Sequence, residues 1–187
     1  MRDLLRENPL LSIQIRVTNV PVHPVSEGLD IVVVAGQPAD STLVGRLLGR
    51  ATWVLAASPE YLNRRGRPSS PADLAHHQCL RLAGASPQHE WALIDDAQHE
   101  HLVAVGGTFE ADDSRRLGEA AYEGLGIGIR PLGECLAAAR AGKLEHVLPG
   151  YRFQPLDVFA LLPPGRQPLP RITACLAALR SAVEALA

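Results

Sequence analysis

Apolar positions along the chain change their spacing several times, and each spacing predicts a different element. Apolar and polar residues alternate over residues 11–17, the period of a strand with one polar face. The run at residues 29–34 is apolar on both faces and predicts a buried parallel strand, and residues 52–57 predict another strand. Residues 171–186 repeat apolar side chains at helical spacing, which predicts a long amphipathic helix.

Proline, glycine and capping residues set the ends of the predicted helices. Asn8-Pro9 ends a helix over residues 3–7, because the residue before proline is pushed out of the α region. Ser58-Pro59 and Ser70-Pro71 each open a helix with an N-cap followed by proline, and Gly142 stops an Ala-rich helix. Strands and helices alternate along the chain, so we expect an α/β fold with a mostly parallel sheet.

Residues 107–131 contain a complete strand–helix–strand unit. A strand ends at Glu110-Ala111, three residues able to cap a helix follow, and Gly124 and Gly126 break that helix before the next strand. In such a unit the helix N-terminus opens beside the carboxyl end of a strand, where open α/β sheets bind small ligands. This unit therefore predicts a ligand-binding α/β protein.

Composition narrows the classes of partner. The chain has 187 residues, 47% hydrophobic and only 4% aromatic, so the core must be aliphatic. Its net charge of −2 gives no basic face of the kind that grips nucleic acid. Three widely spaced cysteines indicate free thiols, with a redox switch as the alternative. With no stretch of ~20 apolar residues and no signal-peptide core, we expect a soluble, cytoplasmic protein.

Four segments together resemble the effector-binding domain of LysR-type transcriptional regulators: residues 29–49, 54–80, 124–131 and 143–163. The resemblance implies two Rossmann-like α/β lobes joined by two crossing strands, as in type 2 periplasmic binding proteins. Lobe one would hold residues 1–54 and 160–187, and lobe two residues 55–159. A small effector would bind in the cleft between them and shift the assembly of dimers or larger oligomers.

The chain departs from the family pattern at its beginning. The winged helix-turn-helix and the first strand of lobe one are both missing, so we expect a fragment or a truncated relative in which DNA is reached only through a domain absent from this chain. Pro21 and Pro24 also fall where the family has a short helix, which shortens or shifts that helix. The expected partners are a small-molecule effector and a second copy or a full-length relative, with no membrane.

The candidate effector contacts come partly from strand and helix ends and partly from the resemblance. A helix cap, a plain turn and a salt-bridged arginine are the alternatives for these positions. Arg130 lies on the strand face of Gly126 and Gly128, where a cation could hold a carboxylate effector. The complete candidate set is Thr18, Gly36, Gln37, Pro38, Asp112, Asp113, Ser114 and Arg130.

Metal, cofactor and catalytic motifs are weak or missing. The sequences His76-His77-x-Cys79 and His99-Glu100-His101 lack the spacing of a tetrahedral zinc site. No G-x-S-x-G occurs, and the glycines at 124–128 enter a strand rather than open a helix, unlike the dinucleotide fingerprint. We therefore expect no metal, no cofactor and no enzyme. The alternatives are a dimerisation partner without a ligand and, less favoured, an enzyme using Asp112 and Asp113.

Overall fold

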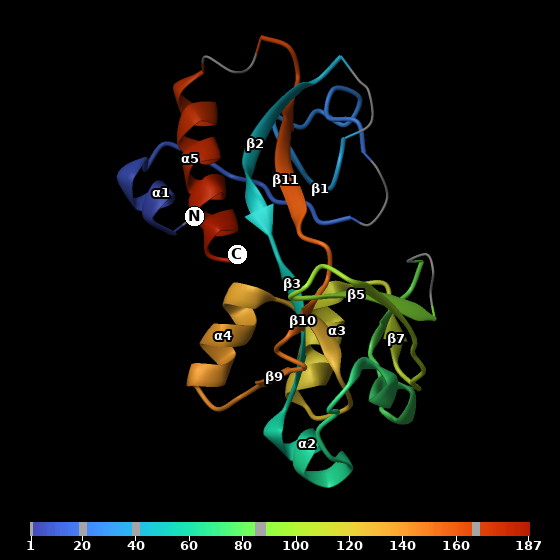
Figure 1. Cartoon of the computed structure of the whole chain (residues 1–187). Coiled ribbons are helices and arrows are strands. Elements are labelled where there is room, and N and C mark those ends of the chain that lie inside the picture. Colours follow the sequence, from blue (N-terminus) through green and yellow to red (C-terminus); the bar gives the residue numbers. More distant parts are fainter. Residues whose placement is uncertain (1, 19–21, 39–41, 85–88, 166–168) are drawn as a thin grey trace. The chain divides into compact units, whose positions relative to one another are not determined.

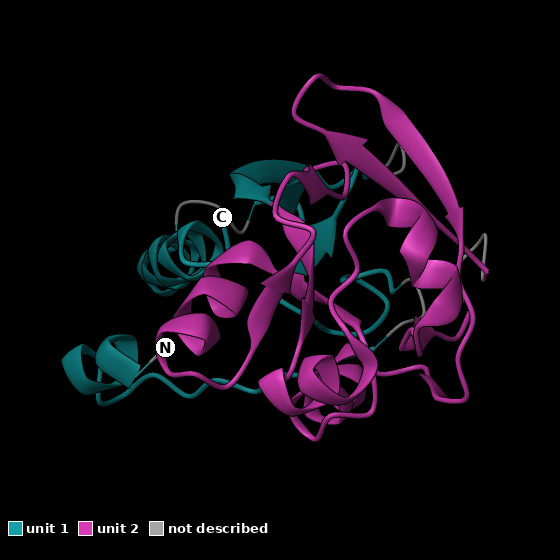
Figure 2. Ribbon diagram, turned by 60° about the horizontal axis from the view of Figure 1, so that its bottom comes forward, with its two compact units in different colours: residues 1–51, 156–187 teal, residues 52–155 magenta. Residues whose placement is uncertain are grey.

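The computed structural model describes residues 2–18, 22–38, 42–84, 89–165 and 169–187. The chain forms two compact units (Figure 2). Unit 1 combines Met1–Ala51 with Leu156–Ala187, and unit 2 is the continuous stretch Thr52–Pro155. The sequence places the corresponding breaks at residues 54/55 and 159/160. No helix in the described ranges is long and apolar enough to cross a membrane.

Unit 1 is built on a three-stranded antiparallel sheet in the order β1-β11-β2 (Figure 1). Its strands are β1 (Val32–Ala35), β2 (Val44–Ala51) and β11 (Leu156–Leu162). Helix α5 (Pro170–Glu184) packs on β2, and α1 (Arg2–Glu7) contacts α5. Of these elements, the sequence predicts α1, β1 and α5.

Two expectations for unit 1 are wrong. Residues 11–17 form no strand, and Ile15 and Val17 are 69% and 78% exposed, because no neighbouring strand pairs with this segment. Strand β1 is antiparallel to β11 instead of parallel, and its residues alternate between half-buried and exposed, with Val33 at 45%. A β-branched run apolar on both faces is thus only partly covered.

Unit 2 has a mixed sheet at its centre. Strand β3 (Trp53–Ala57) lies between β8 (Gly128–Pro131) and β9 (Glu145–Val147), antiparallel to both. The parallel part is short: β4 (Arg81–Leu82) pairs with β7 (Glu110–Ala111), and a single parallel bridge joins Cys79 to Ile127 of the segment leading into β8. The expectation of a mostly parallel sheet is therefore wrong for the described chain, although the β7–α3–β8 unit keeps its parallel strands.

Unit 2 has a second sheet, which includes residues 90–95 and 100–104. It has the order β10-β5-β6, with β5 (Glu90–Asp95), β6 (Glu100–Ala104) and β10 (Tyr151–Arg152). Trp91 anchors it: the side chain is 7% exposed and meets Phe153 edge-on at 6.0 Å between ring centroids. Strand β5 was missed because its segment was interpreted as polar, although its exposed and buried positions alternate along the strand.

Four helices pack on the sheets of unit 2: α2 (Pro59–Arg65), the 3₁₀ helix η1 (Pro71–His76), α3 (Ser114–Tyr122) and α4 (Leu132–Arg140). Ser58 caps α2 as predicted, since its hydroxyl accepts the Tyr61 N–H at 3.2 Å. Asp73 accepts the Ser70 N–H at 3.0 Å at the start of η1. Capping chemistry thus fixes these helix starts.

The residues around Tyr61 and His77 form a buried polar link within the core of unit 2. The Tyr61 hydroxyl accepts the Gln78 N–H at 2.8 Å and lies 3.1 Å from His77 Nδ1. Burial lowers the pKa of His77, so its ring is held neutral. Gly107 and Gly126 pack against the backbone of residues 78–79. A Cβ on Gly107 would lie 2.2 Å from the Cys79 carbonyl oxygen, and one on Gly126 would lie 2.3 Å from the Gln78 carbonyl oxygen. Tyr61, His77 and the two glycines therefore contribute to the packing of unit 2.

Candidate functional site

The carboxyl ends of parallel strands and the start of α3 lie at one edge of unit 2. Strand β4 and the segment before it run parallel to β7 on one side and to Ile127 on the other. Helix α3 begins directly after β7, and Asp113 is its N-cap, with Oδ1 accepting the Arg115 N–H at 2.8 Å. Gly124 ends the helix with a φ of 76°. The arrangement is the strand–helix–strand unit that the sequence predicts.

The three predicted residues at this helix start are all exposed. Of Asp112, Asp113 and Ser114, only Asp113 is the cap. Asp112 and Ser114 are exposed residues beside the N-terminal end of the helix dipole. This geometry suits contact with a small polar ligand, and it places one carboxylate in a capping role.

Arg130 lies at the carboxyl end of β8 and meets the same helix start. Its Nη1 donates to the Ser114 carbonyl oxygen at 3.1 Å, and its Nη2 forms an ion pair with Glu134 of α4. The side chain is 12% exposed. The structure thus brings Arg130 and Ser114 together, with the guanidinium already bonded to protein groups.

The glycines beside Arg130 are approached by the protein itself. A Cβ on Gly126 would meet the Gln78 carbonyl oxygen, and one on Gly128 would come within 3.3 Å of the Leu80 side chain. The close approach that these glycines predict is therefore made by the neighbouring strand and its side chains.

The remaining predicted residues belong to unit 1. Gly36 follows β1 with a φ of 91°, and its N–H donates to the Asp157 carbonyl oxygen at 2.8 Å. Gln37 is exposed, and Pro38 is half-buried. Thr18 is exposed at the end of the segment that forms no strand, and Asn19 and Pro21 lie outside the described residues. The position of these four residues at the ends of their segments is what supports them as candidate effector contacts.

Two grooves among the described residues lie elsewhere. One of about 410 Å³ runs between η1 and β6, and one of about 370 Å³ runs between β2 and α5. Neither groove is lined by a predicted effector contact. The candidate site in unit 2 is the exposed start of α3 beside the end of β8.

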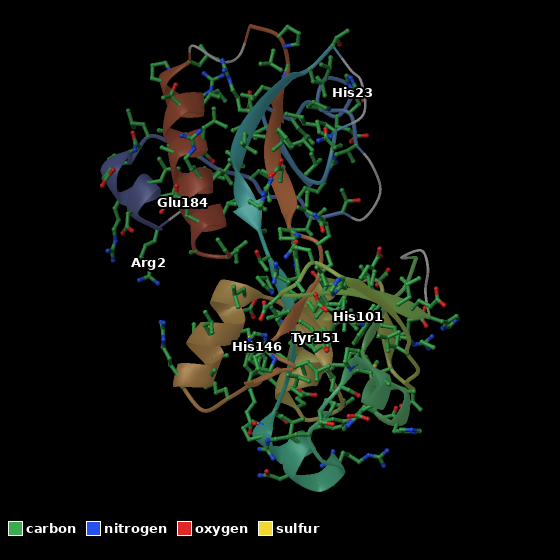
Figure 3. The ribbon with its side chains drawn as sticks, in the orientation of Figure 1. Arg2, His23, His101, His146, Tyr151 and Glu184 are labelled. Carbon is green, nitrogen blue, oxygen red and sulfur yellow. The ribbon has the colours of Figure 1, made fainter. Side chains whose placement is uncertain are left out.

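The histidine pair in the β5–β6 hairpin serves the hairpin. Asp95 lies 3.3 Å from His99 Nδ1 and 3.0 Å from His101 Nε2, and these hydrogen bonds hold its pKa at about 2. His101 also meets the Tyr151 ring edge-on at 5.3 Å (Figure 3). No group of three or more His, Cys, Asp or Glu side chains in the described part of the chain could hold a metal.

The thiols of unit 2 are deeply buried and poorly acidic. Burial raises the pKa of Cys79 to about 12 and that of Cys135 to about 11. Thiolates are the reactive form, so neither cysteine is suited to redox chemistry at neutral pH. Cys175 in unit 1 is half-buried, and burial raises its pKa as well.

Comparison with known proteins identifies the class of domain. The model of the LysR substrate binding domain matches residues 1–184. The HTH-type transcriptional activator AaeR of Escherichia coli K12 is 34% identical over 159 residues, which are 84% of this chain and 51% of that protein. The uncharacterized regulator YhjC of the same strain is 33% identical over 171 residues, 89% of this chain and 56% of YhjC. The chain thus spans about half the length of these curated relatives.

A solved structure shows the same fold. The regulatory domain of CrgA, a LysR-type transcriptional regulator from Neisseria meningitidis, superposes with a TM-score of 0.84 at 23% identity, covering 97% of this chain and 89% of that one. The fold is that of type 2 periplasmic binding proteins, and the family and relatives are transcription regulators, which removes the support for the enzyme alternative at Asp112 and Asp113. The chain belongs to the LysR substrate-binding domain family, the effector-binding domains of LysR-type transcriptional regulators.

Proposed function

We propose that this domain binds a small-molecule effector at the α3 edge of unit 2, and we keep the loop at residues 36–38 of unit 1 as a second candidate contact. The exposed start of α3 carries the proposal, because it combines Asp112, Ser114 and the positive end of the helix dipole at the carboxyl end of β7. Support for the unit 1 loop and for Thr18 comes from the family resemblance and from the loop's position after β1.

The chemistry of this edge favours a ligand with both donors and acceptors. Asp112 and Asp113 carry negative charge, which suits ligand hydroxyl donors, whereas an acceptor or carboxylate on the ligand suits the helix start. Arg130 is a cation bonded to this helix start through Ser114, but Glu134 already compensates its charge. A small acid that also carries hydroxyl groups is therefore the ligand class that we favour.

Binding would act by shifting a population of assembly states in the longer regulator. An effector moves such an equilibrium only if it binds one state more tightly than the other. Effector contacts that are stronger in one assembly state than in the other would supply that difference. DNA would be reached through a domain outside this chain.

A thermal-shift screen with aromatic and aliphatic carboxylic acids tests the proposal. A ligand present at about 100 times its Kd stabilises the folded state by about 2.7 kcal/mol, and this is detected as an increase in Tm. Ser114→Ala and Gln37→Ala should each weaken the effect of a stabilising acid. Gln154→Ala, at an exposed position outside the proposed site, is the matched control and should leave it unchanged.

A dimerisation partner that binds no effector is the second candidate. Leu10, Ile15 and Val17 are 102%, 69% and 78% exposed, and β1 pairs on one side only within the described chain, which favours association with another chain. Sedimentation of the chain alone and mixed with a full-length relative separates the candidates. Mixed dimers without stabilisation by any acid of the panel would support the partner and contradict the sensor.

A further inference from the structure

We propose that Glu134 is a positioning residue that acts through Arg130 to fix the first turn of α3. The inference rests on the proposed function for its consequence in effector binding, whereas its structural half can be tested without any ligand. Glu134 lies on α4, and none of the expected effector contacts includes it. Arg130 thereby changes from a direct ligand contact into the connection between two helices.

The link consists of two bonds made by one guanidinium. Nη2 of Arg130 pairs with Glu134 Oε1, and Nη1 donates to the Ser114 carbonyl oxygen at 3.1 Å. Ser114 is the first residue of α3, directly after its N-cap. One end of the guanidinium therefore holds α4, and the other holds the turn that opens toward the proposed effector.

Gly118 provides the seat for this guanidinium. A Cβ at Gly118 would lie 2.3 Å from Nη1 and 2.7 Å from Cζ of Arg130, closer than carbon and nitrogen atoms can pack. Gly118 stands one turn after Ser114 and is buried. A glycine inside a helix lowers its stability relative to alanine, so its presence here is explained by the space that the guanidinium needs.

Electrostatics makes Glu134 necessary to the link. The Arg130 side chain is only 12% exposed, and its Nε is buried with no hydrogen-bond partner in the described structure. A cation this buried is costly unless it is paired. Without the Glu134 carboxylate, the guanidinium is expected to leave the Gly118 seat for solvent and to release the Ser114 carbonyl.

A direct ligand contact and a positioning role predict opposite effects of Glu134→Gln. If Arg130 binds a ligand carboxylate, removal of a competing carboxylate strengthens binding of acids and leaves neutral analogues unchanged. If Glu134 positions α3 through Arg130, the same substitution weakens acids and neutral analogues alike. The sign of the change and its dependence on ligand charge decide between the two roles.

Amide hydrogen exchange of the intact chain is the ligand-free test. In Glu134→Gln we expect the first α3 amides with a helical acceptor, starting at the Leu117 N–H that bonds to the Asp113 carbonyl, to exchange about tenfold faster. Amides at the far end of α4 should not change. Glu119→Gln, which removes the exposed partner of Arg116 on the same helix, is the matched control and should leave these rates within about twofold.

Gly118→Ala displaces the guanidinium without altering any charge. Alanine strengthens a helix, so faster exchange at the start of α3 in this variant would come from loss of the seat and not from a weaker helix. Unchanged exchange at the α3 start in both Glu134→Gln and Gly118→Ala would overturn the proposal.

Binding measurements then connect the link to function. Benzoate and its neutral analogue benzamide serve as the probe pair, alongside any acid that stabilises the wild-type chain. Weaker binding of both classes in Glu134→Gln, with partial recovery in Glu134→Asp, supports positioning, and tighter binding of acids alone overturns it. If exchange responds but no acid binds the wild-type chain, the link stands and the proposed effector site fails.

Discussion

The two units of this chain achieve very different degrees of burial. Both clusters of buried apolar side chains, one around Leu55, Tyr61 and Leu74 and the other around Val54, Ala120 and Cys135, lie entirely in unit 2. Unit 1 has buried residues along β11 and α5, but β1 and residues 11–17 leave large apolar side chains exposed. Apolar sequence alone does not make a core, because each strand also needs a neighbour to pair with and a layer to cover it.

Truncation of matched leucines should give the largest difference between the units. Leu55 is fully buried in unit 2, whereas Leu47 in unit 1 is 50% exposed. Leu55→Ala should lower the free energy of unfolding by about 2–5 kcal/mol, and Leu47→Ala by about 1 kcal/mol or less. Urea unfolding followed by the fluorescence of Trp53 and Trp91, both in unit 2, reports the first effect directly. Equal decreases in the free energy of unfolding for the two variants would contradict the difference in burial between the units.

Neighbouring glycines test the tight packing of unit 2 next. Gly107→Ala would place a Cβ 2.2 Å from the Cys79 carbonyl oxygen, where only backbone movement relieves the clash. We expect a loss of about 1–3 kcal/mol in the free energy of unfolding. Gly106→Ala is the control, since nothing lies within 4 Å of its Cβ, and thermal unfolding of the pair measures the difference.

A smaller effect is expected from pH. Burial lowers the pKa of His77 below its ordinary value of 6.5, so the unfolded chain binds a proton more readily than the folded one. The stability of unit 2 is therefore full above pH 6.5 and falls as the pH drops from there toward the folded-state pKa. His77→Gln should flatten the slope of unfolding free energy between pH 7 and 5, while His76→Gln at an exposed neighbouring position should retain it.

Thiol labelling should distinguish the units without changing stability. Cys79 and Cys135 of unit 2 are buried, with pKa values raised to about 12 and about 11, whereas Cys175 of unit 1 is half-buried. At pH 8 we expect a disulfide reagent to modify Cys175 first and the other two only on unfolding. Mass spectrometry of the labelled peptides gives the order, and early modification of Cys79 would mean that the core of unit 2 opens readily.

Local signals predicted the helices well, and long-range pairing was beyond them. Ser58, Asp113 and Gly124 stand at helix ends because capping and left-handed backbone depend on adjacent residues. Strand β2 was missed because glycines and arginines interrupt its apolar pattern. The antiparallel sheets were missed because sequence alternation says nothing about which strand becomes a neighbour.

The candidate site shows the same limit. A cap among Asp112, Asp113 and Ser114 and the place of Arg130 at a strand end follow from the sequence, whereas the choice of Asp113 comes from the structure. The pairing of Arg130 with Glu134 has helical i,i+4 spacing but crosses from a strand into the next helix, so helix periodicity does not predict it. Its seat on Gly118 depends on packing between elements and could be found only from the structure.

The division of the chain also sets the order in which it can fold during synthesis. Unit 2 is continuous, so its whole sequence has been made once residue 155 is joined to the chain. Strand β2 waits for β11, since Val44 pairs with Leu162 and Ala51 with Leu156. Domains generally fold as units while the chain emerges from the ribosome. We expect unit 2 to fold first in the nascent chain. Residues 1–51 would then lack their partner strand until β11 and α5 have been synthesised.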